Sequence, residues 1–212
     1  MTVDEWEGEV EVSRETFLRV VEEVEGALRP VPHLFLGGVA SQALGRPRWT
    51  HDVDLIVRPE DADEAVRTLA AAGFRTQRTD PTWLYKALKD EVLVDLVFRS
   101  QGPGDHPSVT LDREMLARAR RADVDGFTVP VVAPEDLALI KCLVFKEHTP
   151  RHWHDALAVL RRDDLDWGYL GRRARQHDPS RVLSLVLYAE SNHIPVPWSL
   201  VRELFEAAWG PR

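Results

Sequence analysis

Hydrophobic and polar positions follow two different patterns along this chain. Up to about residue 132, short apolar runs predict strands, at 34–36, 53–57, 74–79, 84–88, 92–98 and 127–132. Beyond residue 133, apolar positions recur every three or four residues, which predicts helices over 134–147, 152–161, 167–176, 180–190 and 198–208. We therefore expect an α/β (α+β) protein, with a small mixed β-sheet domain over residues 1–132 and a helical C-terminal domain over residues 133–212.

Helices are also expected to flank the sheet. The apolar stripe of Phe17, Val20 and Val24 predicts an amphipathic helix over 13–28, with Ser13 as its N-cap. Proline at an expected start and glycine at an expected end delimit a further helix, from Pro59 to about residue 72. Shorter helices are predicted over 39–44 and 113–121.

Two carboxylates stand at the head of one apolar strand and a third stands inside a later one. In Asp52-Val53-Asp54-Leu55 alternate side chains share a face, so Asp52 and Asp54 point the same way. Asp95 lies within the run Val92 to Phe98, where burying a carboxylate is costly unless it is paired, bound to metal or at an exposed end of the sheet. Paired carboxylates suit Mg²⁺, which also takes phosphate oxygens from a substrate. We therefore predict a metal site for phosphoryl-type displacement.

A glycine pair precedes these carboxylates. Gly37 and Gly38 lie between the predicted strand 34–36 and the predicted helix 39–44. Glycine permits close backbone approach, and a helix N-terminus offers N–H groups to phosphate. Ser41 could add a hydroxyl contact. Each signal alone has an ordinary explanation, since glycine pairs punctuate turns and Asp-x-Asp occurs on solvated strands. Their order along the chain favours a site that transfers nucleotides.

The run from Leu36 through Gly45 to the segment Arg46-Pro47-Arg48-Trp49-Thr50-His51-Asp52-Val53-Asp54-Leu55 resembles the polymerase-β-type nucleotidyltransferase superfamily. It is most similar to the AbiEii-type toxin branch. Residues 134–141 resemble the lysine-bearing helix of that branch, and residues 151–155 resemble its last, aspartate-bearing motif.

The resemblance implies a role for each matched residue. Asp52 and Asp54 would hold Mg²⁺ or Mn²⁺, and Asp95 would complete the metal site and assist deprotonation of the acceptor hydroxyl. Residues that would bind the NTP are Gly37, Gly38, Ser41, Arg48, Thr50 and Lys141. Asp155 would orient Lys141 or the acceptor.

The chain also departs from the family pattern. Gly38 stands where many relatives carry serine, and His152 replaces an acidic residue often found there. Taken without the resemblance, Lys141 is as easily a snorkelling side chain on an apolar helix as a phosphate ligand.

Composition narrows the class of protein further. The 212 residues are 44% hydrophobic, with one cysteine, Cys142, which cannot form an internal disulfide. There is no run of about 18 apolar residues and no signal-peptide pattern, so we expect a cytoplasmic protein without a membrane partner. The net charge of −8 does not indicate nucleic-acid binding. Arginines that gather in the C-terminal half could still form an RNA-binding or merely a solvated face, namely Arg161, Arg162, Arg172, Arg173, Arg175 and Arg181.

The sequence thus predicts an enzyme that moves NMP from an NTP to an acceptor hydroxyl and releases pyrophosphate. The resemblance to the toxin branch implies a tRNA or other RNA acceptor and a partner antitoxin. An antibiotic adenylyltransferase, acting on an aminoglycoside or a lincosamide, is the alternative. Gly37-Gly38, Arg48 and His51-Asp52-Val53-Asp54 are also similar to those enzymes, and an acidic surface suits a cationic drug. A nucleotide-binding regulatory module without turnover is a second alternative, although such a module would not need all three carboxylates.

Overall fold

The structure is a computed structural model that describes residues 12–45, 50–100 and 107–210. Its contacts divide the chain into two compact units, which are described separately. The first contains the described residues up to 43, then 50–99 and 110–132. The second contains residues 44–45, 100, 107–109 and 133–210. The mixed α/β architecture with a helical C-terminal part confirms the predicted fold class.

The first unit is built on a seven-stranded mixed sheet in the order β3-β4-β5-β2-β1-β7-β6. β2 runs parallel to β5, and β1 runs parallel to β7, whereas the other neighbouring strands are antiparallel. The strands are β1 (His33–Phe35), β2 (Asp52–Val57), β3 (Arg75–Asp80), β4 (Leu84–Lys89), β5 (Val92–Val97), β6 (Arg120–Val124) and β7 (Phe127–Val131). The parallel pair β2 and β5 therefore lies near the centre of the sheet, where it brings residues 52–56 beside residues 93–97.

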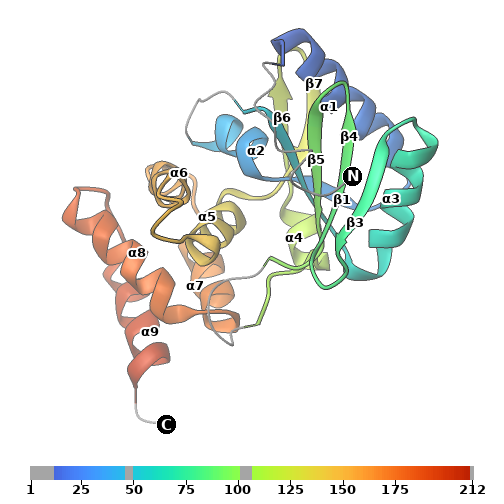
Figure 1. Ribbon diagram of the computed structural model, residues 1–212. Coiled ribbons are helices and arrows are strands. Elements are labelled where there is room, and N and C mark those ends of the chain that lie inside the picture. Colours follow the sequence, from blue (N-terminus) through green and yellow to red (C-terminus); the bar gives the residue numbers. More distant parts are fainter. Residues whose placement is uncertain (1–11, 46–49, 101–106, 211–212) are drawn as a thin grey trace. The chain divides into compact units, whose positions relative to one another are not determined.

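Two helices, α1 (Arg14–Leu28) and α3 (Ala62–Ala71), pack together beside the sheet, as Figure 1 shows. α1 begins where predicted, because the Ser13 hydroxyl accepts a hydrogen bond from the Thr16 amide at 3.2 Å. A 3₁₀ turn, η2 (Pro59–Asp61), leads into α3. Two short helices complete the unit, α2 (Gly37–Leu44, whose last residue falls in the second unit) and α4 (Arg113–Arg118).

The second unit is helical. α5 contacts α6, α7 and α8, and α9 packs on α7 and α8. Almost every residue of α5 is buried, so it is the central helix of this unit. The helices are α5 (Pro134–Val144), α6 (Arg151–Val159), α7 (Trp167–Gln176), α8 (Pro179–Ser191) and α9 (Trp198–Trp209). No described helix combines the length and the apolar character that crossing a bilayer requires.

Several predicted boundaries differ from the structure. The helix expected over 39–44 begins two residues earlier, so both glycines belong to α2. The helix expected over 113–121 ends at Arg118, and residues 120–124 form strand β6, which pairs with β7 around a turn at Asp125-Gly126. These residues alternate as in a strand, a pattern that the helix prediction overlooked: Ala122 and Val124 face inward, whereas Arg121 and Asp123 are exposed.

Candidate active site

The three candidate carboxylates lie on one face of two adjacent parallel strands. In the register of β2 and β5, Asp54 is directly opposite Asp95, and Asp52 precedes Asp54 by two residues. These aspartates are partly exposed, whereas their neighbours Val53 and Val94 are fully buried on the opposite face. The register therefore brings the three carboxylates together on one face of the sheet, where the sequence analysis expected them.

The neighbouring carboxylates disfavour the charged form of Asp95. Burial, followed by the negative charges of Asp54 and Asp52, raises the pKa of Asp95 to about 7, although the Lys86 ammonium acts in the opposite direction. Oδ1 of Asp95 is buried without a hydrogen-bond partner among the described residues. A divalent cation at these oxygens would relieve the repulsion between the carboxylates.

The oxygen donors fit Mg²⁺ or Mn²⁺, although the protein alone does not supply a complete metal site. Within the described ranges, no three or more His, Cys, Asp or Glu side chains lie close enough to one another to hold an ion. Mg²⁺ usually takes one or two protein carboxylates and completes its shell with water and substrate phosphates. The donor set is thus suited to an ion that is shared with a nucleotide.

Gly37 is required by the position of Asp54. A Cβ atom at Gly37 would lie 1.6 Å from Oδ2 of Asp54, and the backbone there has φ +55°. The Gly38 amide, in the first turn of α2, donates to the same Oδ2 at 3.4 Å. The N-terminus of α2 and the Asp54 carboxylate are therefore adjacent, as a shared phosphate and metal site requires.

Gly38 is required by Thr50. A Cβ atom at Gly38 would lie 2.3 Å from the Thr50 Oγ1 atom, so the serine of many relatives does not fit here. Thr50 is buried and its hydroxyl donates to Oδ1 of Asp52 at 2.5 Å. This contact fixes the Asp52 side chain. The function of Thr50 as an orienting residue for Asp52 was not predicted from the sequence.

Ser41 and Arg48 were also predicted to bind the nucleotide. Ser41 is buried, and its hydroxyl donates to the Gly37 carbonyl at 2.7 Å, so a phosphate contact would require it to exchange that bond. Arg48 lies outside the described residues.

Lys86 is a site residue that the sequence analysis missed. It lies on β4 opposite Asp95, is only 6% exposed, and places its Nζ atom 3.6 Å from Asp95 Oδ1. The position of the hairpin turn decides this pairing. Asp90 and Glu91, both with positive φ, form the two-residue turn, which pairs Lys86 with Asp95. A turn one residue earlier, at Lys89-Asp90, would instead pair Lys86 with Leu93.

The second unit brings together the other two predicted site residues. Lys141 on α5 and Asp155 on α6 are both buried, with Lys141 Nζ 3.4 Å from Asp155 Oδ2. Nδ1 of His152 lies 3.5 Å from the same ammonium group. The predicted orientation of Lys141 by Asp155 is thus consistent with a direct ion pair, and His152 joins it.

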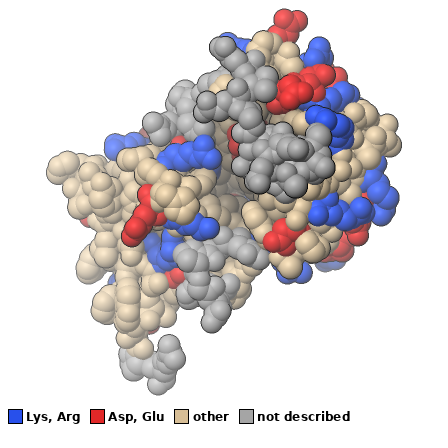
Figure 2. All heavy atoms as spheres, in the orientation of Figure 1, with Lys and Arg blue, Asp and Glu red and all other residues tan. Residues whose placement is uncertain are grey.

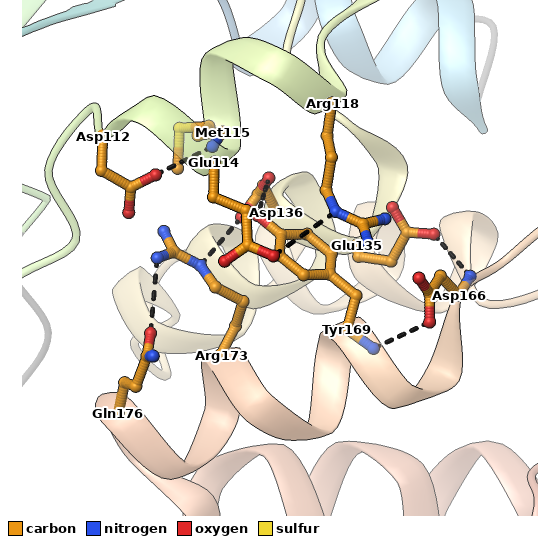
Figure 3. A network of polar contacts seen from close by, with 10 residues as sticks. All are labelled: Asp112, Glu114, Met115, Arg118, Glu135, Asp136, Asp166, Tyr169, Arg173 and Gln176. Atoms are coloured by element: carbon orange, nitrogen blue, oxygen red, sulfur yellow. Dashed lines mark hydrogen bonds and ion pairs between the residues drawn. The ribbon is translucent and has the colours of Figure 1, made fainter.

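A second buried network fixes the N-terminal end of α5 (Figure 3). The Tyr169 hydroxyl is within 3.0 Å of both oxygens of Asp136, and the Arg173 Nε atom donates to Asp136 Oδ1 at 3.2 Å. The neighbouring Glu135 accepts from the Asp166 amide at 2.6 Å. These contacts join α5 to α7 and thereby hold the helix that carries Lys141.

With this geometry established, comparison with known proteins identifies the class. The mixed sheet followed by a helical C-terminal part is consistent with a nucleotidyltransferase fold. The sequence pattern of a family described as uncharacterised nucleotidyltransferase matches residues 7–191, and the chain belongs to this family. No curated protein is significantly similar to it in sequence.

Solved structures show a similar fold at low identity. The solution structure of the antibiotic-resistance factor ANT(2″)-Ia is 16% identical, with a TM-score of 0.53 over 85% of this chain and 95% of that one. A nucleotidyltransferase from Thermotoga maritima is 20% identical, with a TM-score of 0.48 over 68% and 96%. The lincomycin-bound lincosamide antibiotic adenylyltransferase LnuA is 11% identical, with a TM-score of 0.49 over 71% and 99%. The nucleotidyltransferase part of the predicted resemblance is confirmed, and the AbiEii-type branch stays a prediction.

Proposed function

We propose that this nucleotidyltransferase transfers NMP from an NTP to an acceptor hydroxyl with the help of Mg²⁺ or Mn²⁺ bound at Asp52, Asp54 and Asp95. The observation that carries the proposal is the register of β2 and β5, which sets Asp54 beside Asp95 on the same face as Asp52. The bound metal would neutralise the phosphate charge as it develops.

The residues of the site would act on the acceptor and on the nucleotide. The acceptor oxygen attacks the α-phosphorus, the bond to the β-phosphate oxygen breaks, and pyrophosphate leaves. Asp95 would assist deprotonation of the acceptor hydroxyl, because its carboxylate lies beside Asp54 on the same face of the sheet. The amides of Gly37 and Gly38 would bind the triphosphate, and Lys141, held by Asp155, would contact it as well.

An RNA end, tRNA in particular, is the first acceptor to test. Support for it comes from the resemblance of residues 36–55, 134–141 and 151–155 to the AbiEii-type toxins. An antitoxin that masks this activity belongs to the same proposal.

A small cationic antibiotic is the second candidate acceptor, and the contacts of the arginines favour it. At least five of the six arginines that suggested an RNA-binding face have partners among the described residues of the second unit, and one of them, Arg172, lies over the Tyr169 ring. Arg162 pairs with Asp164, Arg173 with Asp136 and Arg175 with Glu203, while Arg181 donates to the carbonyls of Cys142 and Phe145. On the face shown in Figure 2, basic and acidic side chains are interspersed. A protein with a net charge of −8 suits a cationic acceptor.

One experiment tests the chemistry and separates the acceptors. Purified protein is incubated with each α-³²P-labelled NTP and Mg²⁺, with either total bacterial RNA or a panel of aminoglycosides and lincosamides. The Asp52→Ala/Asp54→Ala variant is the control. Label that enters tRNA-sized bands only with the wild type supports the RNA acceptor, and label on a drug supports the alternative. Stoichiometric NTP binding without any transfer would favour the regulatory module.

A further inference from the structure

Lys86 adds a fixed positive charge to the carboxylate site. Lysine is rarely buried unless it is paired, and this side chain is 8% exposed with its Nζ atom 3.6 Å from Asp95 Oδ1. Because β4, β5 and β2 are consecutive in the sheet, their registers align Lys86, Asp95 and Asp54 in one row across three strands. The ammonium group therefore lies on the β4 side of Asp95, and Asp54 lies on the other side.

The contacts of Lys86 differ from those of the next lysine on the same strand. Lys89 lies at the end of β4, pairs with Glu23 at 2.6 Å and donates to the Ala72 carbonyl at 3.0 Å. Glu23 is on α1 and Ala72 ends α3, so Lys89, three residues after Lys86 on the strand, points to the face opposite the aspartates. Lys86 instead contacts a carboxylate whose other close neighbour, Asp54, is also acidic. The charge of Lys86 consequently bears on the site, whereas that of Lys89 does not.

We propose that Lys86 is a tethered counter-ion of the metal site, which holds Asp95 in place in the metal-free protein and opposes a divalent cation at that carboxylate. This inference rests on the proposed function, because it takes Asp95 as a metal ligand. A divalent ion at Asp95 would share the carboxylate with the ammonium group, and like charges at such separations repel strongly inside a protein. The resting enzyme therefore binds metal weakly, and the phosphates of the incoming nucleotide supply the additional negative charge that draws the ion in.

Binding of Mn²⁺ to the full-length protein tests this inference without measuring turnover. The free Mn²⁺ signal is followed by electron paramagnetic resonance at mildly alkaline pH, with and without a non-hydrolysable NTP. The variants are Lys86→Met, the charge-conserving Lys86→Arg, and the matched control Lys89→Met. We expect Lys86→Met to bind Mn²⁺ roughly 10- to 100-fold more tightly without nucleotide, and both other variants to bind it as the wild type does.

Unchanged or weaker Mn²⁺ binding by Lys86→Met would overturn the inference. Asp54→Asn separates this failure from failure of the metal site itself. If the wild type with nucleotide binds Mn²⁺ no better than Asp54→Asn does, the proposed function is wrong. If Lys86→Met does not stay folded without metal, Lys86→Gln replaces it, and the rise of the melting temperature with Mn²⁺ becomes the measurement. A steeper rise for Lys86→Gln than for the wild type supports the inference, and an equal rise contradicts it.

Discussion

The two units differ in how their buried charges are balanced. In the first unit, three carboxylates on β2 and β5 share a face with one lysine on β4, so negative charge is in excess. Burial together with this excess raises the pKa of Asp95 to about 7. In the second unit, the two described carboxylates with no exposed surface each have a cationic partner, Arg173 for Asp136 and Lys141 for Asp155, while the buried Glu135 and Asp178 accept hydrogen bonds from backbone amides. An excess of like charge weakens a fold, and it is retained where a substrate or ion relieves it. Balanced pairs instead join helices.

The largest expected effect is on turnover in the first unit. Asp54→Asn removes one carboxylate of the metal site, and loss of several kcal/mol of charge stabilisation lowers nucleotidyl transfer roughly 10³-fold or more. Because one of the mutually repelling charges is gone, the variant is at least as stable as the wild type. Initial rates with a labelled NTP and urea unfolding measure the two quantities. Asp63→Asn, which alters an exposed pair with Arg78, is the control and retains full activity.

The corresponding change in the second unit affects stability. Arg173→Met leaves Asp136 fully buried without its cation, which costs about 3–5 kcal/mol of unfolding free energy. Arg175→Met, on the same helix, breaks an exposed pair with Glu203 and costs no more than about 1 kcal/mol. Urea denaturation compares them. Equal losses for the two variants would show that the Asp136 network does not hold α5 to α7.

The unbalanced charge also predicts how stability changes with pH. The unfolded chain releases the Asp95 proton near its ordinary pKa of 3.8, whereas the folded protein keeps it up to about pH 7. Between these values the unfolded state binds fewer protons, so the free energy of unfolding falls as pH rises, and it levels off above pH 7.

Asp95→Asn isolates that contribution in metal-free buffer. From acidic to mildly alkaline pH, the wild type should lose on the order of 2–4 kcal/mol relative to this variant. Urea unfolding at both ends of the window, with EDTA present, gives the difference. A constant gap between the two proteins would mean that Asp95 ionises in the folded state as it does in the unfolded chain.

Lys141 tests whether a balanced ion pair of the second unit also serves the reaction, because this residue is proposed to contact the nucleotide. Lys141→Met should raise the KM for the NTP roughly 10- to 30-fold, the equivalent of about 1.4–2 kcal/mol. Arg175→Met is the control, since it breaks an exposed pair between α7 and α9 and leaves KM unchanged. A normal KM for Lys141→Met would make its ion pair with Asp155 purely structural.

Sequence patterns predicted elements better than the contacts between them. Helix α1 with its Ser13 cap and the strand that carries Asp52 and Asp54 follow from local periodicity and capping. Strand β6 was missed because its five residues carry charge on the exposed face and match a helical pattern as well. Lys86 was missed because pairing across a hairpin depends on the turn, and a turn misplaced by one residue shifts each partner by two.

The contacts of the glycine pair were also not predicted from the sequence. A substitution at this pair has the smallest expected effect of those discussed. Phosphate approach explained Gly38 in the sequence, whereas the structure adds the Thr50 side chain, which occupies the space of a Cβ atom. Gly38→Ala should therefore displace Thr50 from Asp52 and cost about 1–2 kcal/mol of stability. The double variant Gly38→Ala/Thr50→Ala removes part of the clash and should be less destabilised than the sum of the single changes. Thermal unfolding of the four proteins gives the coupling, and additive losses would mean that the glycine is needed for the backbone or the phosphate alone.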